Sequence, residues 1–291
     1  MLPTNINSTR ITSYTRVVIG LFFFSGFASL VYQVLWMRHL ALFFGSDVYS
    51  AAIILSAFMG GLSLGSYIAE NIVDRLKNPL FYFGVIEVLI GIYAFFFSDF
   101  LLSFKPFLKD VYQQYYFSTP AIYQVTRIIT ASVALTLPTV LMGATLPLIV
   151  KGFVKKESEM GKYAGLFYSV NTFGGLIGTL ISAFFFLPTF GILFTTKIAI
   201  IINITVGCIA FGFSQWPRLN HLPKEKKSEK VLKKGSYRYD SRMAKFALMA
   251  IFFSGLGALA LEVILTRILS LSFSTTVYSF PIMLSCFLFG I

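Results

Sequence analysis

The chain has 291 residues, of which 56% are hydrophobic and only 12% are charged. A soluble domain carries roughly 25% charged residues, so this composition excludes a water-soluble globular fold. A helix that crosses a bilayer needs about 20 mostly apolar residues, and stretches of this kind recur from Val17 onward. The sequence therefore predicts an all-α, polytopic transmembrane helix bundle whose first partner is the lipid bilayer.

The apolar runs between charged or turn-rich breaks predict the membrane spans in chain order. We expect the first six at Val17–Trp36, Val48–Ile68, Pro79–Phe97, Val125–Val150, Ala164–Phe186 and Gly191–Phe213. Two more follow, at Phe246–Leu265 and in a run from Val277. The last run has about 15 residues up to Ile291, which is short of a full crossing.

The segment from Asp99 to Pro120, between the third and fourth spans, is less apolar. Phe104, Leu108 and Val111 recur at helical spacing there, and this pattern is typical of an amphipathic helix lying on a membrane surface. We expect such a helix on the outer face, interrupted at Pro106. An ordinary polar loop is the alternative.

The net charge of +12 is concentrated in Arg218–Lys245, which holds ten Lys and Arg residues against three acidic ones. This segment and the basic residues near Arg10, Arg75 and Lys151 all follow an even number of predicted crossings. Basic loops mark the cytoplasmic side, so we expect a multi-pass cell-membrane protein of the bacterial inner membrane with a cytoplasmic N-terminus. No nucleic-acid-binding motif accompanies the charge, so we expect no nucleic-acid partner.

The most specific feature is an internal repeat. The stretch FFSGFASLVYQVLWMRHLALFFGSDVYSAAIILSAFMGG from Phe23 returns from Phe252 as FFSGLGALALEVILTRILSLSFSTTVYSFPIMLSCFLFG. Polar positions such as Ser25, Arg38 and Ser50 recur without gaps, and shared hydrophobicity alone does not account for that. Both copies follow a basic segment, as parallel repeats do. The predicted divisions are a first repeat of six helices in 1–215, a basic cytoplasmic linker in 216–245, and the start of a second, truncated repeat in 246–291.

Three blocks carry a family resemblance: the Phe23 stretch with its continuation LSLGSYIAE, PTVLMGATLPLIV from Pro138, and GLFYSVNTFGGLIGTL with LPTFG from Gly165 to Gly191. The chain resembles the membrane portion of the fused major-facilitator and spermidine-synthase family. The resemblance implies a major-facilitator-like six-helix half and the start of a second parallel repeat. It also implies a cytoplasmic aminopropyltransferase-like domain that binds decarboxylated S-adenosylmethionine and a polyamine.

The chain departs from that family pattern because it has no Gly-rich loop after a strand and no acidic residues placed for an amine substrate. We therefore expect no catalytic, cofactor-binding or metal-binding residues in it, and its enzyme activity stays open. The leading hypothesis is a membrane module that anchors or serves a transferase domain absent from this chain. The alternative is a major-facilitator-like transporter of a small solute. A transferase domain or missing helices on another chain are the expected partners.

Several polar residues inside the predicted spans are candidates for function. Glu87 is the foremost, because a lone carboxylate in a membrane is costly unless it is paired, protonated or facing water. Arg127 and Lys197 are possible partners, and a structural ion pair or hydrogen bond is the alternative role. Asn171 is a candidate for a hydrogen bond between helices.

Gln33 and Arg38 of the first copy of the repeat correspond to Glu262 and Arg267 of the second. A duplicated pair could line a central cavity, whereas the arginines could equally extend to the membrane interface from a helix end.

Glycines and prolines inside the spans carry expectations about packing. The Gly61–Gly65 and Gly174–Gly178 pairs have the spacing that lets helix backbones approach closely. Pro138 and Pro147 predict a kinked or locally opened fourth span, of the kind that can mark a binding site in transporters, or a kink that only shapes packing.

Overall fold

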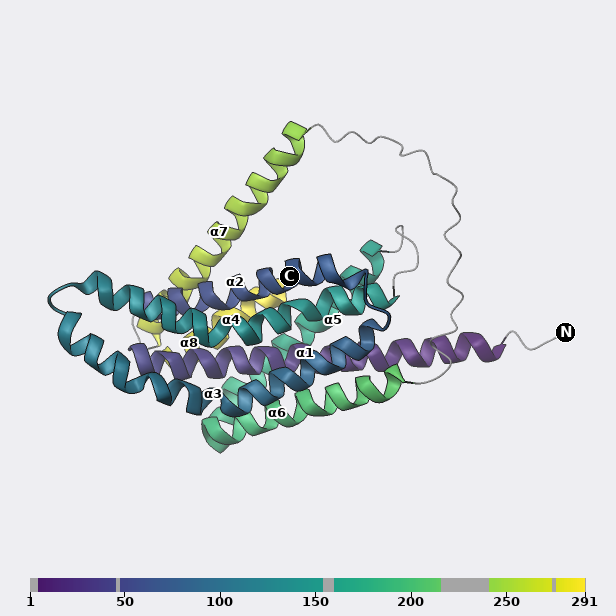
Figure 1. Cartoon of the computed structure of the whole chain (residues 1–291), viewed down its shortest axis with the longest axis horizontal. Helices are drawn as coiled ribbons and strands as arrows, with labels where there is room; N and C mark the ends of the chain where they lie inside the picture. Colours follow the sequence, from purple (N-terminus) through teal and green to yellow (C-terminus); the bar gives the residue numbers. More distant parts are fainter. Residues whose placement is uncertain (1–4, 46–47, 154–159, 216–240, 274–275, 291) are drawn as a thin grey trace.

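The computed structural model describes residues 5–45, 48–153, 160–215, 241–273 and 276–290, and all regular elements in these ranges are helices. In chain order they are α1 (Asn5–Phe44), α2 (Val48–Val73), α3 (Pro79–Tyr115), α4 (Pro120–Phe153), α5 (Met160–Ile181), the π-helical turn η2 (Ser182–Phe186), α6 (Leu187–Ser214), α7 (Ser241–Ser272) and α8 (Thr276–Gly290) (Figure 1). The described part of the chain contains six stretches that are long and apolar enough to cross a membrane. The predicted all-α transmembrane bundle is confirmed.

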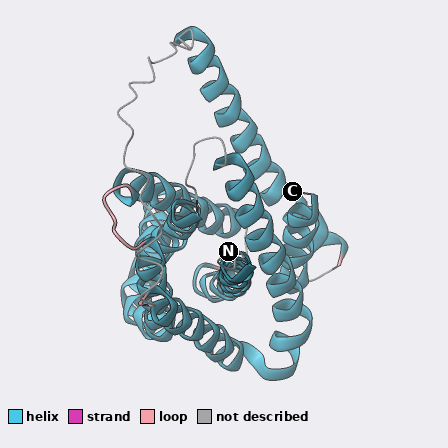
Figure 2. Cartoon of the chain, turned by 90° about the vertical axis from the view of Figure 1, so that its right-hand side faces the viewer, coloured by secondary structure: helices cyan, strands magenta, loops and turns pink. Residues whose placement is uncertain are grey.

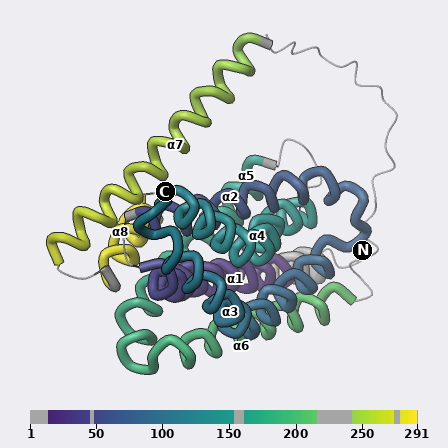
Figure 3. Tube along the Cα trace, turned by 60° about the vertical axis from the view of Figure 1, so that its left-hand side comes forward, coloured from purple at the N-terminus to yellow at the C-terminus, as the bar shows by residue number. Residues whose placement is uncertain are grey.

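The first helix lies at the centre of the bundle. Seen end-on in Figure 2, α1 is surrounded by other helices. In the most apolar stretch of α1, 61% of the residues are buried, whereas 6% of the residues are buried in the most apolar stretch of α7. Helix α7 leans away from the bundle (Figure 3) and packs mainly against α8 and α2. A site enclosed by the bundle therefore has α1 as one of its walls.

The two helices that correspond to the second copy of the repeat are α7 and α8. Helix α8 has 15 residues, which gives a length of about 22 Å, less than the about 30 Å of a hydrocarbon core. The proposed linker lies mostly outside the described residues, and the division into two repeats stays a prediction.

The segment after the third span is helical, as expected, but the predicted interruption at Pro106 is wrong, and so is the alternative of a polar loop. Helix α3 continues without a break from Pro79 to Tyr115, with Pro106 inside it. Its 37 residues span about 55 Å, so its end and the start of α4 project beyond the bundle (Figure 1). The rings of Tyr112 and Tyr123 join these two helices, with centroids 5.4 Å apart.

The turn between α5 and α6 is more compact than the predicted spans imply. The chain continues through η2 into α6 and reverses at Gly191, which has φ 73° and ψ −179°. This region of backbone space is essentially restricted to glycine. A single glycine thus replaces a loop.

Glycines hold the main helix pairs in close contact. A Cβ atom placed on Gly65 of α2 would lie 2.0 Å from the carbonyl oxygen of Val140 in α4, and one on Gly143 of α4 would lie 2.1 Å from that of Leu62. On the other side of the bundle, a Cβ on Gly178 of α5 would lie 2.4 Å from the carbonyl oxygen of Phe27 in α1. The packing interpretation of the glycine pairs is confirmed.

We predict that Gly65→Ala destabilises the protein by about 1–3 kcal/mol, because the added methyl group overlaps a helix backbone that cannot move aside. Gly60 of the same helix is the matched control, since a Cβ there meets nothing within 4 Å. Gly60→Ala should be neutral or stabilising by about 0.5–1 kcal/mol, owing to the better helix propensity of alanine. Thermal unfolding of both purified variants measures the difference, and equal stabilities would contradict the prediction.

Helix α4 stays continuous through Pro138 and Pro147, so the predicted local opening does not occur. Pro138 has no N–H group and cannot donate to the carbonyl of Ala134, four residues earlier. Instead the Tyr93 hydroxyl of α3 donates to that carbonyl oxygen at 2.7 Å. A side chain from a neighbouring helix thus satisfies the acceptor that the proline leaves open.

A double-mutant cycle tests this contact. Tyr93→Phe should cost about 1 kcal/mol, the typical net value of a hydrogen bond. In a Pro138→Ala background residue 138 can donate to Ala134 itself, so the same change should cost clearly less. The free energy of unfolding of the four proteins gives the coupling. Equal costs in the two backgrounds would show that the tyrosine does not act through the proline.

Polar contacts gather at the end of the bundle where α2 ends and α3 begins. Asp74 forms an ion pair with Lys151 of α4, and the hydrogen bond and charge of Lys151 hold the pKa of Asp74 below its usual value. Asn78 Nδ2 donates to the carbonyl oxygen of Ser214, at the end of α6, at 2.9 Å. The segments around Arg75 and Lys151 therefore lie at the same end of the bundle, as the charge pattern requires. That this end faces the cytoplasm stays a prediction.

Candidate functional site

Helices α1, α3 and α6 meet at Glu87, whose side chain is 1% exposed. The Ser25 hydroxyl of α1 donates to Glu87 Oε1 at 2.5 Å, within the range of hydrogen bonds to charged oxygens. Asn203 of α6 donates from Nδ2 to the backbone carbonyl oxygen of Glu87 at 3.4 Å. We call Ser25, Glu87, Asn203 and the nearby Tyr32 the three-helix centre.

Two polar atoms of the three-helix centre have no hydrogen-bond partner among the described residues. They are the hydroxyl oxygen of Tyr32 and Oδ1 of Asn203, and both side chains are 0% exposed. The amide of Asn203 cannot simply be turned round, because a carbonyl oxygen accepts hydrogen bonds and Nδ2 is the end that can donate. An acceptor and a hydroxyl are thus left open beside a buried carboxyl group.

The structure does not bring Glu87 together with Arg127 or Lys197. Arg127 is fully buried, but it donates to Ser50 Oγ and, at 3.0 Å, to Gln124 Oε1. Its guanidinium carbon also lies 5.3 Å from the ring centroid of Tyr123. Lys197 is exposed.

The separation of Glu87 from Arg127 follows from helix geometry. The contact between Tyr93 and Ala134 sets the register of the antiparallel helices α3 and α4. From this contact Glu87 lies six residues toward one end of the bundle and Arg127 seven residues toward the other. At about 1.5 Å per residue they are roughly 20 Å apart along the bundle. The hydrogen-bonded alternative for Glu87 is the one that the structure contains.

The duplicated pair divides by residue type. Gln33 and Glu262 are buried, and Gln33 Nε2 and Glu262 Oε1 have no partner among the described residues. Arg38 is partly exposed and Arg267 is exposed, as expected for arginines that extend toward an interface.

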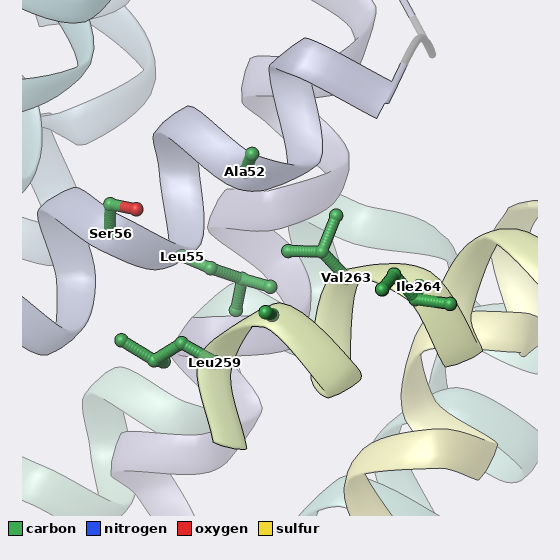
Figure 4. A pocket seen from close by; sticks show the side chains of 7 residues that line it. Ala52, Leu55, Ser56, Leu259, Val263 and Ile264 are labelled. Carbon is green, nitrogen blue, oxygen red and sulfur yellow. The ribbon is translucent and has the colours of Figure 1, made fainter. Parts of the chain in front are cut away.

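A cavity of 340 Å³ lies between α2 and α7 (Figure 4). Its lining is apolar except for Ser56, and it includes Leu55, Leu259 and Val263. The residues that line it do not include Gln33 and Arg38 or their counterparts Glu262 and Arg267. The role of this duplicated pair in a cavity stays a prediction.

Asn171 belongs to the contact between α1 and α5. A Cβ atom on Gly26 would lie 2.2 Å from the backbone oxygen of Asn171 and 2.7 Å from its Oδ1. Its position is therefore set by close helix packing, and no hydrogen bond of its side chain to the three-helix centre is present.

Sequence reasoning identified Glu87 but not its neighbours. Ser25 is a polar position that recurs in the repeat, as Ser254, which is a usable signal. Asn203 is a single amide in the apolar run IIINITVG, and polar residues inside membrane helices commonly bond across helices. Tyr32 has no comparable signal. Among the described residues no group of His, Cys, Asp and Glu side chains could hold a metal ion.

The apolar helices and the buried polar centre define the class: a helical membrane bundle with polar residues enclosed in its interior. A comparison with known proteins finds similarity to a polyamine aminopropyltransferase from Oceanobacillus iheyensis, with 24% identity over 180 residues. The similarity covers 62% of this chain but 32% of the relative, so it spans about a third of that protein's length. No family model matches the chain, and no solved structure matches it.

Proposed function

We propose that the chain is the membrane-embedded module of a spermidine-synthase-like protein of the fused major-facilitator kind, and that it anchors or serves an aminopropyltransferase-type domain. The observation that carries the proposal is the similarity to a polyamine aminopropyltransferase. Helices fill most of the described chain, so a match of 180 residues necessarily includes several apolar helices. The shared part is thus membrane-type sequence, and the remaining two thirds of the relative leave room for a soluble transferase.

The architecture supports an anchoring or serving role. The turn between α2 and α3, the end of α4 and the end of α6 lie at one end of the bundle, where the positive-inside rule places the cytoplasm. A cytoplasmic domain following this module would use decarboxylated S-adenosylmethionine and a polyamine. The chain itself supplies membrane attachment and, through its buried polar centre, contacts for a small solute.

We predict that membranes from cells expressing the gene in its natural context transfer an aminopropyl group from decarboxylated S-adenosylmethionine to putrescine. Deleting the gene should remove this activity from the membrane fraction. The purified 291-residue chain should be inactive alone, because no residues for that chemistry are expected in it. Transfer activity that stays in the membrane fraction after deletion would contradict the proposal, and so would activity of the purified chain.

The second candidate function is transport of a small solute, and the buried Glu87 favours it. An ionisable side chain inside a membrane bundle is costly and commonly marks a solute or ion pathway. The three-helix centre also joins three different helices, so relative movement of these helices would change access to Glu87.

Uptake of labelled putrescine into proteoliposomes tests this function. We expect Glu87→Gln to lower uptake by about tenfold or more, which corresponds to about 1.4 kcal/mol of lost interaction. Glu70→Gln is the control, because it removes an exposed carboxyl group of α2 outside the three-helix centre. Undiminished uptake by Glu87→Gln would remove the transport role of this residue.

A further inference from the structure

We propose that the three-helix centre is a binding site for one compact monovalent cation, which is either the ammonium group of an amine or an alkali-metal ion. The inference goes beyond the proposed function, because it assigns a ligand class to Ser25, Tyr32, Glu87 and Asn203 whether or not a transferase domain is attached. Ammonium groups and alkali ions share the relevant chemistry, since both combine a single positive charge with a preference for oxygen acceptors.

The buried carboxyl group of Glu87 lacks a countercharge among the described residues. Glu87 is 1% exposed, and its side chain accepts a hydrogen bond from the neutral hydroxyl of Ser25. A buried carboxylate without a countercharge is strongly unfavourable. Arg127 lies toward the other end of the bundle and Lys197 is exposed, so neither of these cations supplies the countercharge.

The side chain of Asn203 leaves a hydrogen-bond acceptor open beside Glu87. A proton on Glu87 would remove the charge, but Asn203 Oδ1 would still lack a donor. A buried amide oxygen left without a hydrogen bond costs about 1–3 kcal/mol. A cation beside Glu87 removes both costs, because it neutralises the carboxylate and is coordinated or hydrogen-bonded by the amide oxygen.

The packing of α1, α3 and α6 places the polar groups on the same side of Glu87. Ser25 and Tyr32 are seven residues apart on α1 and so lie on one face of the helix. Side chains of a helix lean toward its N-terminus, which brings the Tyr32 ring back toward the level of Ser25. Tyr32 also interacts electrostatically with Glu87. Gly91 lies one turn beyond Glu87 on α3, and Asn203 packs beside it. A Cβ atom added to Gly91 would lie 3.6 Å from the Cβ atom of Asn203.

The polar groups of the three-helix centre are all oxygen ligands. A carboxylate, two hydroxyls and an amide oxygen are the hard oxygen ligands that metal cations without soft character prefer, and they are equally acceptors for the N–H groups of an ammonium ion. The set contains no sulfur or imidazole group that would favour a transition metal.

Thermal unfolding of the purified full chain in lipid nanodiscs tests the proposal. Sodium chloride and putrescine dihydrochloride are the probes, and choline chloride at equal ionic strength is the control, because its quaternary ammonium group is too large and has no N–H donor. We expect the midpoint to rise by a few degrees with increasing concentration of at least one probe, as a ligand of the native state requires. A rise with sodium alone identifies an alkali-ion site, and a rise with putrescine alone identifies an ammonium site.

Three variants separate a binding site from a structural contact. Glu87→Gln should abolish the ligand-dependent rise, and Glu70→Gln, which removes an exposed carboxyl group of α2, should keep it. Tyr32→Phe removes only a hydroxyl that has no hydrogen-bond partner among the described residues, so without ligand it should unfold at the same or a higher temperature, while its apparent dissociation constant should rise several-fold. If Glu87→Gln fails to fold, the dissociation constant of Tyr32→Phe still shows whether the three-helix centre binds the cation.

The proposal is overturned if neither probe raises the midpoint above the choline control, or if the rise is the same in Tyr32→Phe and Glu87→Gln as in the natural chain. In that event a buried water or a proton satisfies the centre. A negative result leaves the aminopropyl-transfer test unaffected, because that test measures the membrane fraction and does not depend on Glu87.

Discussion

Lipid hydrocarbon offers no hydrogen bonds, and this constraint governs the described structure. Each backbone N–H and C=O group inside the bilayer must find its partner within the protein, so the chain folds into helices. The contact from Tyr93 to the carbonyl of Ala134 shows the same rule at a single atom. Where Pro138 removes a backbone donor, a side chain from the next helix takes its place, and α4 continues without a break.

Close packing takes over the role that the hydrophobic effect has in water. Lipid tails are as apolar as leucine, so apolar surface alone does not bring helices together. Gly65 and Gly143 between α2 and α4, and Gly178 between α1 and α5, let the helix backbones touch. This accounts for the contrast between the central α1 and the thinly packed α7, because no Cβ added to Gly255 or Gly257 of α7 would meet an atom within 4 Å.

The three-helix centre is an exception inside this apolar packing. Burying Glu87, Tyr32 and Asn203 together costs free energy that three apolar side chains would not cost, and two of their polar atoms have no partner in the described chain. Such an arrangement is expected where a polar ligand completes the site. The similarity to a polyamine aminopropyltransferase bears instead on the proposed link to a transferase domain, which is independent of this site.

Hydropathy by itself determined the fold class and most of the spans, because bilayer thickness imposes a minimum length on every apolar run. It also pointed to Glu87, since an isolated carboxylate in such a run is conspicuous. The interruption at Pro106 was a wrong prediction, because this proline does not end the helix, and ring contacts between Tyr112 and Tyr123 support the longer helix.

The partners of Glu87 were decided by the tertiary structure. Arg127 and Lys197 were reasonable partners by charge, but helix register places Arg127 far along the bundle and leaves Lys197 exposed. Ser25 and Asn203 are distant in sequence and meet Glu87 only because α1, α3 and α6 converge. The sequence by itself determined which polar residues cost free energy when buried in the bilayer. Only the packing of the helices determined which of these residues contact one another. Contact between helices depends on their rotation and register, which apolar composition does not specify.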